Sequence, residues 1–408
     1  MTLLGCGDAV RDSSGGAWIA QHDTIGDTVI VRTISGSVGL GEYVLEREVT
    51  IGVLEGPEEY IIGNVRMLAV GPQGDIYAYD SQVPALRKYD RDGRFLVTVG
   101  REGGGPGEYR SATGLVVMPD GTVKLWDPEG PRLSSFSPEG EYLDGRRVES
   151  YGFYGYRSLF ADTLGNFYVQ LHIVEATDDA QRTVGRGLLK LGPDGEVVDS
   201  LLEPDLGYEP PQLEGMFRTA DITNLFAEPI PFMPGPSWTF SPHGHFVAGV
   251  GGSYAVSLLR TDGRALRIER QLTPVPVDRD EKAAWRESVY NRMRRGNPGW
   301  RWDGPDIPNS KPAFHGLRVG MDGRIWVQLY QKAERREPVD SEEPNPREEW
   351  PEPTVYDMFE PDGRYLGALH VPRETTIHVM RGDYAWGITR DSLDVQYIER
   401  FRLVEGTR

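Results

Sequence analysis

Two nearly identical segments, 49 residues apart, constrain the fold of this chain more than any other feature. One reads Gly-Pro-Glu-Glu-Tyr over 56–60 and the other Gly-Pro-Gly-Glu-Tyr over 105–109. Each follows a run of β-forming residues and precedes an apolar run that ends at a turn glycine, Gly74 or Gly121. A phosphate-binding loop would need a helix after its glycines, whereas strand-like alternation follows here. The segments therefore mark the boundary of a repeating β-rich unit.

The turn glycines give the internal structure of each unit. Gly74 and Gly93 are 19 residues apart, as are Gly121 and Gly140, and Gly244 and Gly263. Each pair predicts two hairpins, because Asp-Gly and related turns between alternating apolar residues are the strongest local hairpin signal. Four antiparallel strands recurring every ~40 to 50 residues are typical of a β-propeller blade.

Six such units fit between residues 17 and 404, which we expect to form a single domain. The last unit contains Tyr384–Phe401 and lacks a fourth strand, while Glu48–Ile51 stands alone before the first unit. Pairing of Glu48–Ile51 with the last unit would close the ring and protect an open sheet edge. We therefore predict an all-β fold, a six-bladed β-propeller with four-stranded antiparallel blades, closed by an N-terminal strand and carrying one helical insertion.

The repeats resemble six-bladed β-propellers of the NHL-repeat-like type, and the segment Gly100–Tyr109 resembles a linker of bacterial envelope members of that group. Related propellers include lyases, lactonases and pure binding modules, so the resemblance implies a fold and leaves the activity open.

Charge and composition limit the partners. The net charge of -18 disfavours nucleic acid, whose binding requires a basic surface. It also disfavours general attraction to anionic lipid. No apolar run approaches the ~18 residues that span a bilayer.

The single cysteine lies near the start of the chain. Leu3-Leu4-Gly5-Cys6 resembles the bacterial lipobox, in which the cysteine is lipidated, and residues 1–16 would then form a flexible tether. Only five residues precede Cys6, so either a signal peptide lies upstream of Met1 or the match is coincidental. The resemblance implies a cell-envelope protein, lipid-anchored in the outer membrane or periplasmic.

Long insertions indicate a binding face. In a four-stranded blade, the short turns lie on one face, and the second-to-third loops and blade-to-blade links lie on the other. All four long insertions, 171–186, 203–235, 273–313 and 331–353, belong to the second kind, and loops on a rigid scaffold commonly carry function. One contains a predicted helix capped by Asp280, with Trp285, Val289 and Met293 on one face. This helix either packs on the propeller rim or acts as a lid that brings Trp300 and Trp302 toward the axis.

Residues eight positions before each first-hairpin glycine are expected at the channel mouth on the insertion-bearing face. They include Arg66, Arg157, His315 and, less securely aligned, Glu374, a set that could bind a small anion, with His315 as a candidate acid or base. The alternative is a structural ion-pair girdle. A single histidine in this ring disfavours zinc, and we expect no cofactor, although calcium stays open.

Two functional hypotheses follow. The first is a propeller that binds a small anionic ligand, a peptide or an envelope protein through the insertion-bearing face and channel mouth, without turnover. The alternative is a lyase or hydrolase acting on a small anionic substrate at the channel mouth, with Arg66 and Arg157 holding the anion.

Overall fold

The computed structural model describes residues 17–147, 159–176, 181–218, 223–337 and 345–406. Antiparallel strands form almost all of its regular structure, with α1 (Arg279–Gly296), α2 (Pro346–Glu349) and a 3-10 turn at Glu58–Tyr60 as the helical elements of these residues. No helix in the described part is long and apolar enough to cross a bilayer.

Three separate sheets contain four strands each, connected in sequence order as the turn glycines predicted. In the first, Gly74 and Gly93 occupy the two hairpin turns at φ values of 94° and 86°, a left-handed region that favours glycine. The three sheets are β4 (Val65–Val70), β5 (Ile76–Asp80), β6 (Ala85–Tyr89) and β7 (Phe95–Val99); β10 (Gly114–Val117), β11 (Val123–Asp127), β12 (Arg132–Phe136) and β13 (Tyr142–Arg147); and β14 (Leu159–Ala161), β15 (Phe167–Ala176), β16 (Gln181–Leu191) and β17 (Val197–Leu202).

Two larger sheets contain the remaining four-stranded units. In one, the hairpin β1 (Ile19–Ile25) and β2 (Thr28–Ser35) adds to the outer strand of β20–β23, with β2 parallel to β23. In the other, β3 (Gly41–Ile51) lies between β24–β27 and β28–β30. The strands of these units are β20 (Pro236–Phe240), β21 (Phe246–Val250), β22 (Ala255–Leu259), β23 (Ala265–Arg270), β24 (Phe314–Val319), β25 (Ile325–Leu329), β26 (Thr354–Phe359), β27 (Tyr365–Val371), β28 (Thr375–Arg381), β29 (Tyr384–Arg390) and β30 (Gln396–Glu405).

Strand β3 pairs with β30 at the residues that the sequence predicted. Thr50 lies opposite Glu399 and Ile51 opposite Ile398 in an antiparallel register. The earlier part of β3, from Gly41 to Val44, pairs in parallel with β27, which the sequence did not indicate. The N-terminal strand thus connects two units that are distant from it in sequence.

Apolar side chains on both faces of each sheet form the core, because alternate residues of a strand point to opposite faces. Ile76 and Ala78 of β5 pack toward the unit of β28–β30, whereas Tyr77 and Tyr79 pack toward the unit of β10–β13. Further clusters lie between each following pair of units along the chain. The core is therefore a series of layers between neighbouring sheets.

The second Gly-Pro-x-Glu-Tyr segment connects two units through buried contacts. Strands β8 (Arg101–Glu102) and β9 (Glu108–Tyr109) pair in parallel, and the buried Tyr109 hydroxyl donates to the Val99 carbonyl at 2.9 Å. A Cβ at Gly100 would lie 2.6 Å from the Gly107 carbonyl oxygen, so only glycine fits there. The repeated motif is a structural linker.

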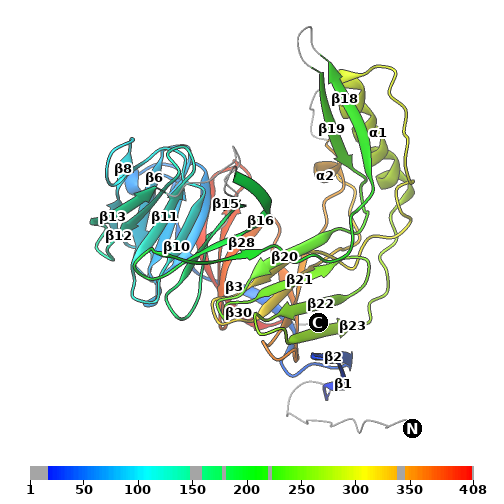
Figure 1. Ribbon diagram of the computed structural model, residues 1–408, viewed down its shortest axis with the longest axis horizontal. Coiled ribbons are helices and arrows are strands. Elements are labelled where there is room, and N and C mark those ends of the chain that lie inside the picture. Colours follow the sequence, from blue (N-terminus) through cyan, green and yellow to red (C-terminus); the bar gives the residue numbers. More distant parts are fainter. Residues whose placement is uncertain (1–16, 148–158, 177–180, 219–222, 338–344, 407–408) are drawn as a thin grey trace.

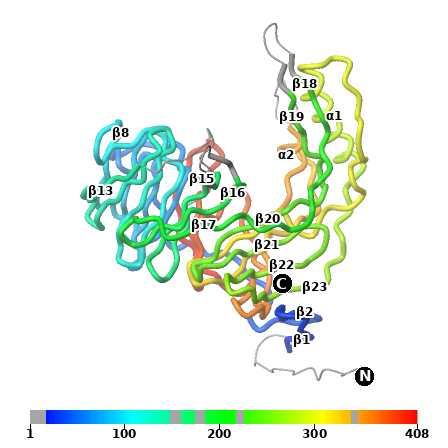
Figure 2. Tube along the Cα trace, viewed as in Figure 1, coloured from blue at the N-terminus to red at the C-terminus, as the bar shows by residue number. Residues whose placement is uncertain are grey.

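An arm built from the insertions projects from the body of the molecule (Figure 1). Its hairpin, β18 (Gln212–Arg218) and β19 (Thr223–Pro229), packs against α1, and α2 from the 331–353 insertion lies beside α1 (Figure 2). The helix cap differs from the prediction: Asp278, not Asp280, caps α1 and forms a capping box with Glu281.

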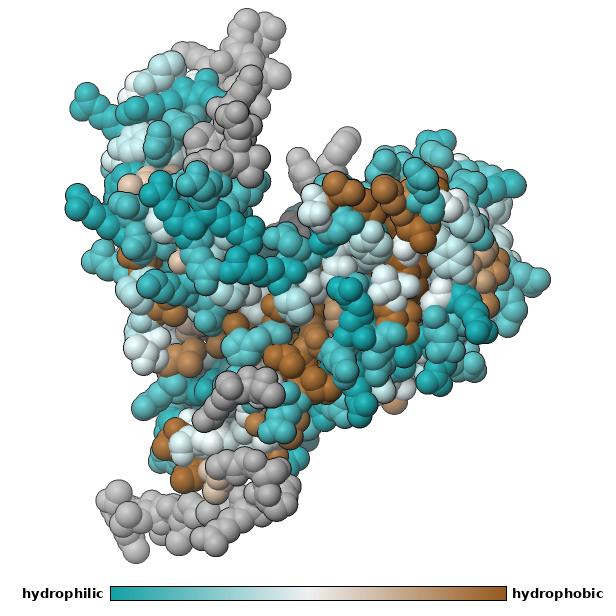
Figure 3. Space-filling model, turned by 180° about the vertical axis from the view of Figure 1, so that it is seen from behind, coloured by the Kyte–Doolittle hydropathy of each residue, from teal (hydrophilic) through white to brown (hydrophobic). Residues whose placement is uncertain are grey.

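The predicted helix face is largely buried, but against a different surface. Val289 and Met293 are fully buried in the core of the arm. They belong to the same apolar cluster as Leu213 of β18 and Ile230, which directly follows β19. The prediction of rim packing was wrong because the 203–235 insertion supplies its own hairpin to cover the helix. The space-filling view shows a notch between the arm and the rest of the molecule (Figure 3).

Candidate functional site

The structure does not bring the described residues of the predicted anion site into contact with one another. Arg66 is exposed, at a bulge in β4. Glu374 forms an ion pair with Arg336 at 3.3 Å. His315 lies at a bulge in β24, where its ring stacks on Tyr330 with centroids 3.6 Å apart. Arg157 and Cys6 lie outside the described residues.

Trp300 and Trp302 belong to the arm, so the expectation that they reach toward the axis was wrong. Trp300 is 7% exposed and its indole donates to the Glu214 carbonyl at 2.9 Å. Trp302 donates to the Pro305 carbonyl, and its ring lies beneath the Arg286 guanidinium. Both residues complete the packing around α1 and do not form a lid.

The insertion-bearing face contains a pocket of about 510 Å³ at the foot of the arm, which we call the arm-base pocket. Segments on both sides of α1 contribute to it, together with the loop before β22, the last residue of β23 and Tyr330, which directly follows β25. Its walls include four prolines and three aromatic residues, and two cations reach it. These residues are Pro234, Pro274, Pro308, Pro312, Phe232, Tyr254, Tyr330, Arg270 and Lys311.

The first cation, Arg270, is held by a buried carboxylate, Asp357. Arg270 Nη1 and the Tyr254 hydroxyl both donate to Asp357 Oδ2, and the Tyr365 hydroxyl donates to Oδ1 at 2.8 Å. Burial and the neighbouring Asp357 charge raise the pKa values of Tyr254 and Tyr365, so both hydroxyls remain protonated donors. The Arg270 guanidinium also lies over the Tyr365 ring at 4.1 Å. Asp357 thus fixes one wall of the pocket.

The second cation, Lys311, is completely buried between two glutamates. Its Nζ atom donates to Glu281 Oε1 at 2.7 Å and to Glu352 Oε1 at 2.9 Å. The other oxygen of Glu352 accepts from the Gln331 amide at 2.7 Å and lies 3.5 Å from His315 Nε2. This network ties α1 and the 331–353 insertion to the start of β24.

The two glutamates experience opposite environments. Burial raises the pKa of Glu281 even though Lys311 opposes it. Burial would also raise the pKa of Glu352, but contacts from His315, Lys311 and the Gln331 amide outweigh it and hold that pKa below its usual value. Burial raises the pKa of Tyr330 to about 12, so its hydroxyl is neutral near pH 7.

Charge balance determines what the arm-base pocket can bind. Arg270 and Lys311 supply two positive charges, and Asp357, Glu281 and Glu352 supply three negative ones. The cations are already neutralised by protein carboxylates, so the pocket does not provide the free positive charge that an anion would need. It provides rigid apolar walls and a few hydrogen-bonding groups instead.

The sequence contained a signal for part of this site that our reasoning missed. Asp357 interrupts the apolar strand Thr354–Phe359, and a buried carboxylate requires partners. Lys311 stands between Ser310 and Pro312 with no comparable signal. Among the described residues, no group of three or more His, Cys, Asp and Glu side chains is arranged to hold a metal ion.

Comparisons with known proteins give a fold but no family. No protein-family model matches the chain, and no curated protein matches it in sequence. A member of the DUF4221 family from Bacteroides vulgatus superposes with a TM-score of 0.50 at 10% identity, over 90% of this chain and 100% of that chain.

Two other solved structures are more distant. A Bacteroides fragilis protein whose name describes it as exported has a TM-score of 0.47 at 10% identity, over 88% of this chain and 95% of that one. Virginiamycin B lyase from Staphylococcus aureus has a TM-score of 0.44 at 9% identity, over 89% and 100%. At these identities, similarity concerns the fold alone. Together with the repeated four-stranded antiparallel units, the first match indicates that the chain has a β-propeller fold.

Proposed function

We propose that this protein is a binding propeller that holds an extended segment of a partner protein in the arm-base pocket, without turnover. The observation that carries the proposal is the pocket itself, whose charged groups are paired within the protein and whose walls are formed by prolines and aromatic rings. Such walls lose little conformational freedom on binding.

The hydrolase or lyase hypothesis receives less support from these residues. A general acid or base must reach substrate with a suitable pKa. His315, the candidate, stacks on Tyr330 and faces Glu352, and the described members of the predicted anion site have separate partners. Binding without chemistry accounts for this arrangement more simply.

The architecture that supports this site is inferred to be a six-bladed ring. Six apolar clusters support this inference, because each links one four-stranded unit to the next and the last links β28–β30 to β4–β7. In this arrangement, β3 is the fourth strand of the sixth blade and closes the ring. Closure would hold the arm in a fixed position relative to the pocket.

We further propose that the protein functions in the bacterial cell envelope, anchored through a lipid on Cys6. The lipobox-like Leu3-Leu4-Gly5-Cys6 motivates this proposal. The similarity in fold to a protein named as exported is consistent with it.

Filling the pocket tests the proposed binding. Ser253 lines the pocket and is exposed, so Ser253→Trp should occupy it without disturbing the core. Ser200→Trp, on the outer strand β17, is the matched control. Peptides would be selected from a phage-displayed random library on the wild-type protein, and their affinities measured by fluorescence anisotropy.

We expect Ser253→Trp to weaken the selected peptides by at least about tenfold, equivalent to ~1.4 kcal/mol, and Ser200→Trp to leave them unchanged. Equal affinities of the selected peptides for both variants would refute the assignment of the pocket. A different outcome would assign the pocket to a small ligand and not to a partner segment. In that case no peptide is selected, and a small molecule raises the melting temperature of the wild type but not that of Ser253→Trp.

A further inference from the structure

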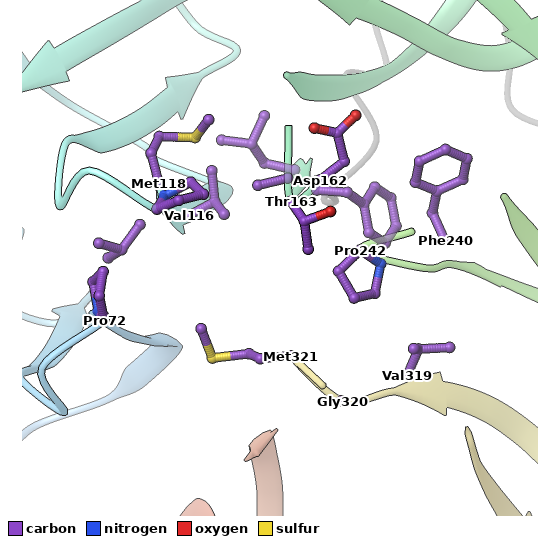
Figure 4. Close-up of a pocket in the computed structure, with 15 residues that line it drawn as sticks. Pro72, Val116, Met118, Asp162, Thr163, Phe240, Pro242, Val319, Gly320 and Met321 are labelled. Atoms are coloured by element: carbon purple, nitrogen blue, oxygen red, sulfur yellow. The ribbon is translucent and has the colours of Figure 1, made fainter. Parts of the chain in front are cut away.

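A second cavity, separate from the arm-base pocket, lies where the innermost strands of five units converge. Its volume is about 370 Å³. Figure 4 shows side chains from these strands and their turns surrounding an open space, among them Pro72, Val116, Phe240, Val319 and Met321. We call it the turn-face cavity.

The position of the turn-face cavity separates it from the face assigned to partner binding. Pro72, Met118, Thr163, Pro242 and Met321 lie at or just after the ends of β4, β10, β14, β20 and β24, where each first hairpin turns. The arm insertions leave from the opposite ends of the units. The cavity therefore opens on the face with short turns.

The chemistry of the walls selects an apolar ligand. Asp162 is the one acidic or basic side chain among the lining residues, and its oxygens are occupied by donors from residues 164–168. They accept from the amides of Leu164 and Asn166, from the Asn166 side chain, and from the Tyr168 hydroxyl at 2.8 Å. A charged ligand would lose its hydration here without gaining an ionic partner.

Apolar walls exposed to water at this position have a free-energy cost that a ligand would remove by covering them. Met321 is 38% exposed, and the flexible thioethers of Met118 and Met321 can adapt to different shapes. The volume lies in the range of small-molecule sites, and residues from five units line it.

We propose that the turn-face cavity binds a small, uncharged, apolar molecule, either a compact hydrocarbon or the acyl chain of a lipid. This site does not depend on the proposed partner binding at the arm base.

The test uses the uncharged dye N-phenyl-1-naphthylamine, whose fluorescence rises in apolar surroundings, with the full chain. Met321→Trp should fill the cavity, and Met216→Trp on β18 is the control, because Met216 is 40% exposed. Ser253→Trp serves as a second control for the arm-base pocket.

We expect Met321→Trp to weaken dye binding at least tenfold, with both controls unchanged. If Met321→Trp does not fold, as judged by its melting curve, Met321→Gln should still weaken binding, because it places an amide without a partner in an apolar wall. Displacement of the dye by naphthalene identifies a compact hydrocarbon, and displacement by the uncharged ester monododecanoylglycerol identifies an acyl chain. Unchanged dye affinity in the folded Met321 variants, or displacement by neither competitor, would overturn the proposal.

Discussion

Removing the charge of Asp357 should strongly destabilise the fold, because this carboxylate is fully buried and serves three donors. In Asp357→Asn the shape is kept, but Arg270 loses its counter-ion. The new NH2 group must take the place of Oδ2, facing Arg270 and the Tyr254 hydroxyl, or of Oδ1, facing the Tyr365 hydroxyl, and all three of these groups donate hydrogen bonds to Asp357. Breaking a buried ion pair by removing one partner costs about 3–5 kcal/mol. The Arg270 side chain is 25% exposed, which favours the lower end of that range.

The expected change in melting temperature follows from the size of the chain. An unfolding entropy of about 2.1 cal/mol/K per residue gives ~0.9 kcal/mol/K for 408 residues, so the melting temperature should fall by roughly 4–6 °C. Differential scanning calorimetry measures it directly.

Asp262→Asn is the matched control for this measurement. Asp262 accepts from the Arg264 amide and side chain in an exposed hairpin turn, where asparagine can still accept from the amide. It should melt at the same temperature as the wild type, because exposed ion pairs contribute little. A melting temperature for Asp357→Asn within about 1 °C of the wild type would refute the reasoning that the Asp357 contacts hold this wall of the pocket.

Three further predictions concern pH, ring closure and localisation. Burial and the Arg318 charge lower the pKa of His378 to about 4, so the folded state prefers the neutral imidazole. The neutral side chain contributes its full stability above pH ~6.5, and this contribution is lost as the pH falls from ~6.5 through about 4. The difference in unfolding free energy between wild type and His378→Gln should therefore shrink or reverse by up to about 3 kcal/mol over that interval, and a constant difference in urea titrations would contradict it. Ile51→Ala, at a position 1% exposed in β3, should cost about 2–5 kcal/mol, whereas Ile25→Ala, at 66% exposure in β1, should cost little; equal midpoints in urea would remove the closing role of β3. Expressed with a complete upstream signal, Cys6→Ser should move the protein from the membrane fraction to the soluble fraction, and equal recovery of both forms in the membrane would exclude the anchor.

Local sequence chemistry predicted the repeating units well. Turn glycines such as Gly74 and Gly93 act through their own backbone conformation, so their spacing was sufficient to place the hairpins. The pairing of Glu48–Ile51 with the last strand followed from the same repeat pattern. The parallel addition of β2 to β23 did not, because no repeat contains an equivalent strand.

The candidate site was less accessible to sequence reasoning because it depends on contacts between distant segments. The spacing placed Arg66 and His315 near the starts of β4 and β24, where both lie at bulges, but it gave no information about their neighbours. Lys311 meets Glu281 and Glu352 only after three segments have folded together. The arm was unexpected for the same reason, since its hairpin and helix come from two separate insertions.

Hydrogen exchange measured by mass spectrometry, with and without a selected peptide, tests most directly whether a partner segment occupies the arm-base pocket. We expect slower exchange on peptide binding in the two segments that line the pocket, 270–275 and 308–313, with no change in the turns that line the turn-face cavity. Slower exchange confined to those turns, or unchanged exchange in both pocket-lining segments with the peptide bound, would contradict it.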